Sequence, residues 1–208
     1  MAPARVAAGR IVGYRSSPSL VRWRTVGQAE IDELLAAHQA IGGTGPGRRT
    51  ATQQINHALI VQLASQFQRY CRDLHGLCAD AVVSAAPPPL QPAFVLAFTA
   101  GRKLDRQNAH SGTLGDDFGR FGPRFWLAVD ALGPQFAVRR RRRDQVNAWR
   151  NAIAHQDFRH VGSDPLTQDT RADLPTFRAW RSALDQLAGG IDRAMYGELA
   201  GIIGARPW

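Results

Sequence analysis

Hydrophobic residues recur every three to four positions along most of this chain, the spacing that gathers side chains on one face of a helix. The first run starts near Gln28 and reaches Ile41, and the glycine-rich segment 42–47 then ends it as a flexible connector. A second run follows Thr50 or Thr52, either of which can cap a helix, and stops before the prolines at 87–89. We therefore predict two helices here, of which the second is the longest in the chain.

The remaining pattern predicts three further helices and no strands. An aromatic-rich segment at 118–132 is interrupted at Gly122-Pro123, and the polar stretches 106–117 and 162–174 are expected to be loops. No alternating pattern of useful length and no internal repeat is visible. The further helices are predicted over about 92–104, 136–156 and 175–203.

We therefore predict an all-α fold, an up-and-down helical bundle with a long central helix and additional flanking helices. Residues 1–26 mix Arg, Pro, Ser and Gly without a sustained period, which indicates an irregular N-terminal arm in which Val21 and Trp23 dock on the body. Residues 27–206 are predicted to form a single helical domain, since a chain of 208 residues with 44% hydrophobic residues can bury a real core.

The cysteines and the lack of long apolar runs indicate the compartment. Cys71 and Cys78 lie two helical turns apart, too distant to bridge, and are interpreted as small core residues in a reducing environment. No apolar run approaches membrane-spanning length, and the N-terminus lacks the apolar core of a secretion signal. We expect a cytoplasmic protein without a membrane partner.

The net charge of +9 comes almost wholly from arginine, because Lys103 is the only lysine. Arginine binds phosphate through a planar fork of donors and stacks on bases, which favours a nucleic-acid partner, although a GC-rich genome also enriches arginine. The run Arg139 to Arg143 is harder to attribute to genome composition. Five consecutive residues cannot share one helix face, so some of these arginines should pair with acidic groups or a partner chain while the rest bind phosphate.

Candidate chemistry is concentrated on the helix predicted over 136–156. At about 100° per residue, its apolar side is a seam formed by Val146, Trp149 and Ile153. His155 projects close to the opposite side with Asn151 one turn before it, and Arg150 borders the seam. Ala148 and Ala152 have short side chains that would let another helix approach and enclose the site.

These residue types can support attack of a ribose 2′-hydroxyl on its neighbouring phosphate without a metal. An imidazole titrates near neutrality and transfers protons, which suits His155 to acid or base catalysis. Arg150 can hold the phosphate or stabilise the crowded phosphorane, and Asn151 can orient either group. A solitary helical histidine is more often structural or merely exposed, so the assignment depends on the three residues together.

The stretch Arg150-Asn151-Ala152-Ile153-Ala154-His155 resembles the Arg-x(4 to 6)-His signature of the HEPN superfamily. Residues 102–108 and 114–122 look like the RiboL-PSP type of bacterial HEPN protein, and the resemblance covers roughly residues 50–160. It implies a helical bundle that acts as a metal-independent endoribonuclease, usually as a homodimer that brings two motifs together. It also implies that Arg150 and His155 are the catalytic pair, that Asn151 assists them, and that an antitoxin or a defence-system protein is a possible partner in a toxin-antitoxin or antiviral setting.

Further polar residues are candidates for RNA contact or for ordinary surface. Segment 106–110 contains a second Arg and His, and either lines the substrate groove or forms a surface loop. His57, Arg69 and Arg72 are expected on a solvated helix face. The predicted RNA-binding residues are Arg139, Arg140, Arg143, Asn147, Arg106 and His110.

Metal and cofactor chemistry has little support. The histidines and cysteines do not form zinc-ligand spacings, Asp116-Asp117 is an isolated acidic pair, and neither a phosphate-binding loop nor a nucleophile elbow is present. We expect no metal and no cofactor. The leading hypothesis is an RNA-cleaving enzyme; the alternatives are a non-catalytic nucleotide- or RNA-binding module in a larger defence assembly and a purely structural helical protein.

Overall fold

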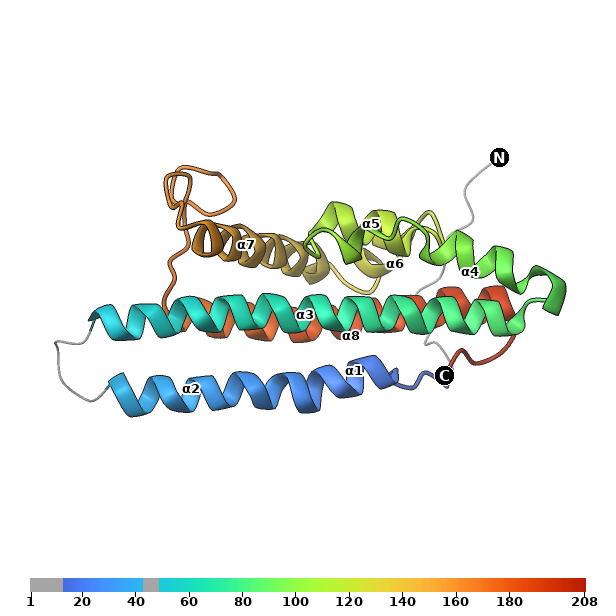
Figure 1. The fold of residues 1–208 in the computed structure, drawn as a ribbon, viewed down its shortest axis with the longest axis horizontal. Helices are drawn as coiled ribbons and strands as arrows, with labels where there is room; N and C mark the ends of the chain where they lie inside the picture. The colour runs from blue at the N-terminus through green and yellow to red at the C-terminus, as the bar shows by residue number, and fades with distance from the viewer. Residues whose placement is uncertain (1–12, 43–48) are drawn as a thin grey trace.

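The longest helices of the chain alternate in direction (Figure 1). The computed structural model describes residues 13–42 and 49–208, so the predicted connector at 42–47 lies almost wholly outside the described residues. Helices α3 and α8 pack side by side in the middle, α2 covers one side of α3, and α7 packs against α3 and α8 on the other. The bounds of these helices are Gln28–Gly42 for α2, Arg49–Ala85 for α3, Gln135–His155 for α7 and Leu174–Ile203 for α8.

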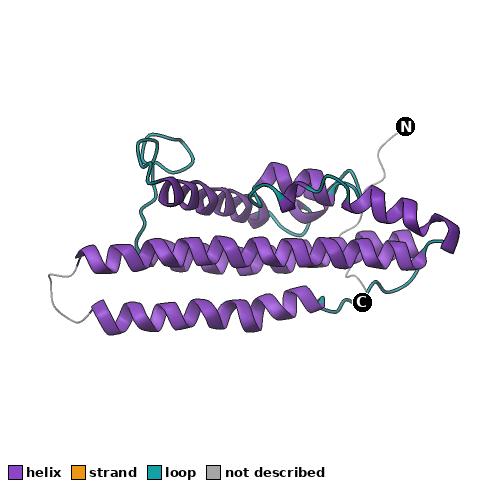
Figure 2. Cartoon of the chain, viewed as in Figure 1, coloured by secondary structure: helices purple, strands orange, loops and turns teal. Residues whose placement is uncertain are grey.

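Shorter helical elements complete the structure. Every regular element in the described residues is helical, which confirms the all-α prediction (Figure 2). Within the same residues, no helix combines the length and the apolar character needed to cross a membrane. The shorter α-helices are α1 (Pro18–Arg22), α4 (Gln91–Thr99), α5 (Ser111–Phe118) and α6 (Phe125–Asp130), with a π-helical segment at Trp23–Gly27 and 3₁₀ turns at Pro88–Leu90 and Lys103–Asp105.

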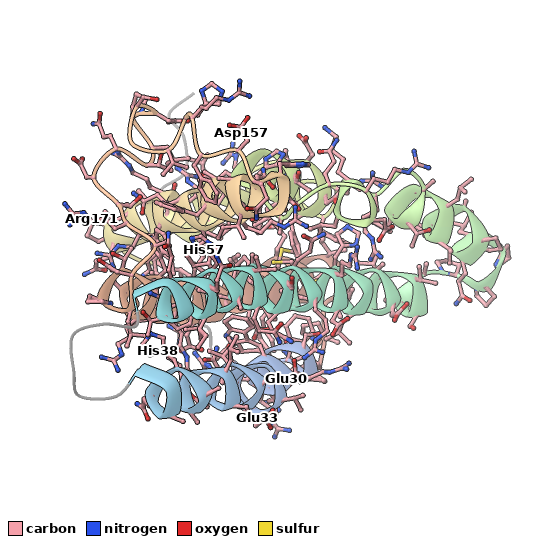
Figure 3. The ribbon with its side chains drawn as sticks, turned by 60° about the vertical axis from the view of Figure 1, so that its left-hand side comes forward. Glu30, Glu33, His38, His57, Asp157 and Arg171 are labelled. Carbon is pink, nitrogen blue, oxygen red and sulfur yellow. The ribbon has the colours of Figure 1, made fainter. Side chains whose placement is uncertain are left out.

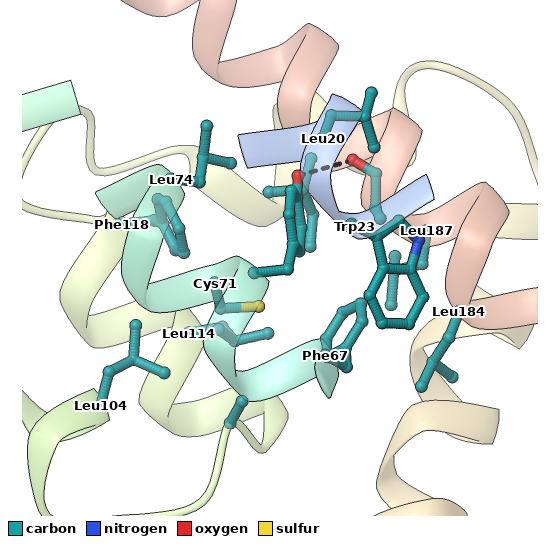
Figure 4. Close-up of a cluster of buried hydrophobic side chains, with 14 of the residues drawn as sticks. Leu20, Trp23, Phe67, Cys71, Leu74, Leu104, Leu114, Phe118, Leu184 and Leu187 are labelled. Carbon is teal, nitrogen blue, oxygen red and sulfur yellow. Dashed lines mark hydrogen bonds between the residues drawn. The ribbon is translucent and has the colours of Figure 1, made fainter. Parts of the chain in front are cut away.

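The core forms where α3 meets α8. Phe67, Tyr70 and Cys71 of α3 are buried, and the Tyr70 hydroxyl donates a hydrogen bond of 2.8 Å to the Ala188 carbonyl of α8 (Figure 4). Cys71 and Cys78 are buried free thiols, as their spacing predicts, and burial raises the pKa of both thiols.

Helix α8 has clear start and stop signals and one position where α7 comes very close. The Asp173 side chain accepts a hydrogen bond of 2.9 Å from the Thr176 backbone N–H, and Gly204 ends the helix in the left-handed region at a φ of 67°. A Cβ atom at Gly190 would overlap the ring of Phe136 at the start of α7. Because Gly190 has no side chain, α7 can pack this closely on α8.

The prediction of an irregular arm is wrong for residues 18–26, which are helical and lead directly into α2. Ser17 caps α1 by accepting a hydrogen bond from the Leu20 N–H, and its own N–H and hydroxyl donate to the buried carboxylate of Asp192. Trp23 is only 2% exposed, as expected, whereas Val21 is half exposed. The cap and the buried Trp23 order a segment whose composition has no helical period.

Two predictions for the middle of the chain are also wrong. The helix predicted over 92–104 ends at Thr99, and the stretch expected to be a loop at 106–117 contains α5. His110 caps α5, since its Nδ1 accepts a hydrogen bond of 3.3 Å from the Thr113 N–H. Asp117 is buried and accepts hydrogen bonds from the backbone N–H groups of Lys103 and Leu104, at 2.9 and 2.7 Å. These tertiary contacts make a polar, glycine-containing sequence helical.

Candidate active site

Helix α7 ends at His155, and the chain then turns back over the last turns of the helix. Gln156 has a φ of 53°, a left-handed conformation that costs a non-glycine residue about 1 kcal/mol. Two hydrogen bonds stabilise the turn, from the Asp157 N–H to the Ala152 carbonyl at 3.0 Å and from the Gln156 side-chain amide to the Ile153 carbonyl at 2.8 Å. The turn begins residues 156–173, which we call the return loop.

A pocket of about 260 Å³ lies between α7 and the return loop. It opens on the face of α7 that carries Ala148 and Ala152, the short side chains expected to admit another helix. In this chain the return loop approaches that face instead. The pocket is lined by Ala148, Asn151, Ala152 and His155 from α7 and by Asp157, His160, Val161, Asp164 and Thr167 from the return loop.

Two of the three predicted catalytic residues line this pocket. Asn151 and His155 are exposed side chains one turn apart on its α7 wall. Arg150 is not a lining residue, but its Nη1 donates a hydrogen bond of 3.2 Å to Oδ1 of Asn151. The Asn108 side-chain amide donates to the same oxygen at 2.7 Å. The amide of Asn151 thus links the Arg150 guanidinium to the pocket wall.

The return loop is fixed to the bundle by contacts from two helices. Figure 3 labels His57 on α3 and Asp157 and Arg171 on the return loop. On α7, the Trp149 indole donates to the Thr170 hydroxyl at 2.8 Å, and the Gln145 amide donates to the Leu166 carbonyl at 3.0 Å. On α3, the His57 ring stacks on Phe158 with centroids 5.5 Å apart. His57 is buried rather than on a solvated face as predicted, and burial lowers its pKa.

The polar side chains of the return loop differ in how they are paired. Asp157 forms an ion pair with Arg159 at 2.7 Å, which holds the pKa of its carboxyl well below the usual range. Asp164 uses Oδ1 to accept a hydrogen bond of 2.7 Å from the Leu166 N–H, and its Oδ2 has no partner among the described residues. Thr167 is 1% exposed, and its hydroxyl has no hydrogen-bond partner in the described part of the chain.

The arginine run at the start of α7 is largely engaged within the protein. Arg139 stacks over the Phe136 ring at 4.5 Å, while Arg140 stacks over Trp126 at 4.9 Å and pairs with Asp130 at 3.3 Å. Arg141 donates to the Pro165 carbonyl of the return loop at 2.8 Å. The expected pairing with acidic groups is therefore met inside the chain for Arg140 and Arg143.

Arg143 is a correction to the predicted RNA-binding set, because it is only 1% exposed. Its guanidinium donates to the Ala109 carbonyl, donates to the Ser111 hydroxyl at 3.1 Å and pairs with Asp144 at 2.9 Å. Burial lowers its pKa to about 10, so the group stays charged at neutral pH. Asn147 is likewise buried at 9% exposure. Neither side chain can reach RNA without rearrangement of the helix packing.

The second Arg and His, at 106–110, form a loop that packs beside α7. Asn108 contacts Asn151, and the Ala109 carbonyl accepts from Arg143, so this segment lies along the edge of the candidate site. Arg106 and His110 are exposed, although His110 is committed to capping α5. The loop prediction for this short stretch is confirmed, and the loop lies beside residues 150–155.

Sequence reasoning missed the return-loop side of the pocket. His160, Asp157, Asp164 and Thr167 lie in a segment without period, so nothing in the spacing relates them to His155.

In residues 13–42 and 49–208, no group of three or more His, Cys, Asp or Glu side chains is arranged to hold a metal ion. Comparison of the chain with models of known protein families, with curated proteins and with solved structures finds no match.

Proposed function

We propose that this protein is a metal-independent endoribonuclease of the HEPN type, with its active site at the end of α7. The observation that carries the proposal is the placement of Asn151 and His155 on one pocket wall, with the Arg150 guanidinium hydrogen-bonded to Asn151. Asn151 therefore lines the pocket with the proton-transfer group and is hydrogen-bonded to the anion-binding group. The resemblance of residues 150–155 to the HEPN signature supports the same assignment.

In the proposed reaction, the ribose 2′-oxygen bonds to the neighbouring phosphorus, and the bond from phosphorus to the 5′-oxygen breaks. His155 takes the proton of the attacking hydroxyl as general base. Arg150 donates to the phosphate oxygens as negative charge accumulates in the phosphorane, because most of its N–H donors are not used by Asn151. The leaving 5′-oxygen takes a proton from a second acid. The products carry a 2′,3′-cyclic phosphate and a 5′-hydroxyl.

The second acid is proposed to come from a second copy of the chain. In a homodimer, two copies of Arg150, Asn151 and His155 face each other across a cleft, and the imidazolium of the second His155 protonates the leaving oxygen. Arg106, Arg139, Arg140 and His110 are proposed to contact the RNA backbone nearby, whereas Arg143 and Asn147 are left out because both are buried. We propose a cytoplasmic role in a toxin-antitoxin or antiviral system, in which an antitoxin or defence-system protein controls the activity.

The test is cleavage of a mixed RNA pool in excess chelator, with the product ends mapped. The proposal predicts chelator-resistant cutting that leaves cyclic-phosphate ends and is lost in His155→Ala. Equal cleavage by His155→Ala and Arg150→Ala would overturn it. His155 is exposed, so its replacement should leave the fold intact, and a melting curve checks this.

One observation favours a second candidate, a non-catalytic RNA-binding module. Arg150 does not line the pocket that holds His155, so within one chain the two groups do not converge on a common cavity. In such a module Arg150 would hold phosphate and His155 would serve only as a polar contact. Tight RNA binding without strand scission, by a well-folded protein under every condition tried, would select this reading.

A further inference from the structure

The pocket beside α7 is poorly suited to the phosphate itself. Asp157 and Asp164 both line it, and their carboxylates repel a phosphodiester at short range. Arg150 lies outside the lining residues, next to Asn151 at the pocket edge. A nucleotide bound here would therefore keep its phosphate at the edge and place a neutral part inside.

The pocket lining matches a flat, partly polar group. Ala148, Ala152 and Val161 supply small apolar surfaces, and His155 and His160 supply two imidazole rings of the kind on which unstacked RNA bases stack. The volume of about 260 Å³ is below the roughly 300 to 1,000 Å³ of pockets for drug-sized ligands. It suits a single base better than a larger ligand.

The Thr167 hydroxyl and one carboxylate oxygen of Asp164 lack protein partners among the described residues and line the pocket side of the return loop. The Thr167 hydroxyl is buried and unpaired among the described residues, so a ligand that reaches it would satisfy a group that is costly to leave alone. The Asp164 carboxylate keeps Oδ2 free of protein partners in the same residues, and an ionised carboxylate only accepts hydrogen bonds. An acceptor in this position selects bases that present an amino group.

We propose that the pocket between α7 and the return loop binds one unstacked base of single-stranded RNA, with Asp164 selecting cytosine, adenine or guanine over uracil. These three bases carry an exocyclic amino group, whereas uracil presents a carbonyl oxygen that Asp164 would repel. The inference rests on the proposed function only in that the ligand is RNA. It assigns base preference to the return loop and cleavage to α7.

The direct test compares binding of oligocytidylate and oligouridylate, because the two bases have the same size and differ only in the amino or carbonyl group at C4 and in the proton on N3. Both oligonucleotides carry 2′-O-methyl groups throughout, so that no 2′-hydroxyl can attack and binding is measured without cleavage. Fluorescence anisotropy should give a dissociation constant about 10-fold lower for oligocytidylate, about the discrimination that one good base contact provides. Asp164→Asn should reduce this ratio to near one, because an amide can also donate to the uracil carbonyl.

Two further variants keep the test specific to the pocket. Thr167→Val should weaken binding of both oligonucleotides, since it removes the hydroxyl and keeps the shape. Asp169→Asn makes the same charge change at an exposed return-loop residue outside the pocket lining, and should leave the ratio unchanged. If Asp169→Asn also brings the ratio of the two dissociation constants near one, net charge alone sets the preference and the proposal is overturned.

The outcomes separate this inference from the proposed function. Equal binding of the two oligonucleotides by the wild type, a preference that Asp164→Asn leaves intact, or no binding at all would overturn the base pocket even if RNA is cleaved. Conversely, a preference that depends on Asp164 would stand even if the chelator experiment finds no cleavage, and the protein would then be a base-selective RNA-binding module.

Discussion

The two halves of α7 carry similar residue types and use them in opposite ways. The N-terminal half holds the arginine run, and four of its five side chains stack on aromatic rings, pair with Asp130 or Asp144, or bind loop carbonyls, while Arg142 is exposed. The C-terminal half holds Arg150 and His155, which face a pocket edge and solvent with few contacts to the rest of the protein. The denser charge cluster is therefore structural, and the sparser one is available for chemistry.

The difference shows how an arginine run should be interpreted. Arg143 and Asp144 join α7 to segment 109–111, and Arg141 joins it to the return loop. Both contacts hold the segments that border the pocket. The arginine run contributes to the site chiefly by positioning its walls, while Arg150 is the arginine placed to meet a phosphate.

Among the arginines of α7, the largest expected effect is the loss of cleavage in Arg150→Ala. We expect the rate to fall about 100-fold to 1,000-fold, the usual effect of removing one donor that stabilises transition-state charge. Arg142→Ala is the matched control, because it removes the same charge from an exposed position on the same helix. Rates are measured on one RNA at saturating protein. Equal losses of rate in the two variants would show that the net charge of α7, and not the position of Arg150, sets the cleavage rate.

Arg143→Ala should act on stability instead. It leaves the Ala109 carbonyl and the Asp144 carboxylate without their buried partner, which is expected to lower the free energy of unfolding by about 3 to 5 kcal/mol. Arg142→Ala should change it by about 0.5 kcal/mol or less. Urea denaturation of the two variants checks both values. An Arg143→Ala protein as stable as the wild type would mean that this guanidinium does not hold the helices together.

Acid should destabilise the bundle through His75, which lies beneath α5. Its ring is buried, its Nε2 lies 3.2 Å from the Asp117 carbonyl, and burial followed by the charge of Arg102 lowers its pKa from 6.5 to about 4. The unfolded chain therefore binds a proton between pH 6.5 and 4 that the folded protein does not bind, so stability falls as the pH falls through this window. Across this window the free energy of unfolding falls by about 3 kcal/mol.

The variant His75→Gln tests the origin of that pH dependence. Glutamine cannot titrate but keeps an N–H donor for the Asp117 carbonyl, so the slope of unfolding free energy against pH should flatten between pH 6.5 and 4. Urea denaturation at several pH values measures the slope. An unchanged slope would assign the acid sensitivity to other groups.

Two glycines provide the smallest predicted effects and concern only packing. Gly190→Ala places a methyl group against the Phe136 ring, which should cost about 1 to 3 kcal/mol. Gly76→Ala, in the middle of α3, meets nothing within 4 Å among the described residues and should instead stabilise the helix by about 1 kcal/mol. Thermal unfolding distinguishes the two. A stable Gly190→Ala protein would show that α7 can move away from α8 at little cost.

The sequence predicts the long helices well because each buries a continuous apolar stripe. Helices α2, α3, α7 and α8 begin and end within a few residues of their expected bounds. Helix α5 was missed because Gly112, Gly115 and Asp116 break the pattern, and its helix depends on the His110 cap and the burial of Asp117. Such tertiary causes leave no period in the sequence.

The candidate site could be predicted only in part for the same reason. The 3.6-residue repeat places Asn151 and His155 on one line of α7, and both do line the pocket. The repeat could not show that Arg143 and Asn147 point inward, because their burial depends on segment 109–111 and on helix packing. Nor could it relate Asp164 and Thr167 to this face, since a loop without period brings them there.

The central claim is that the exposed end of α7 performs proton transfer on RNA. The most direct test measures cleavage rates of His155→Ala and His160→Ala, two variants that each remove an imidazole from the same pocket. His155→Ala is expected to be about 100-fold to 10,000-fold slower than the wild type with an unchanged melting temperature, and His160→Ala to lose far less activity. Cleavage by His155→Ala at the wild-type rate would show that this imidazole is not the proton-transfer group.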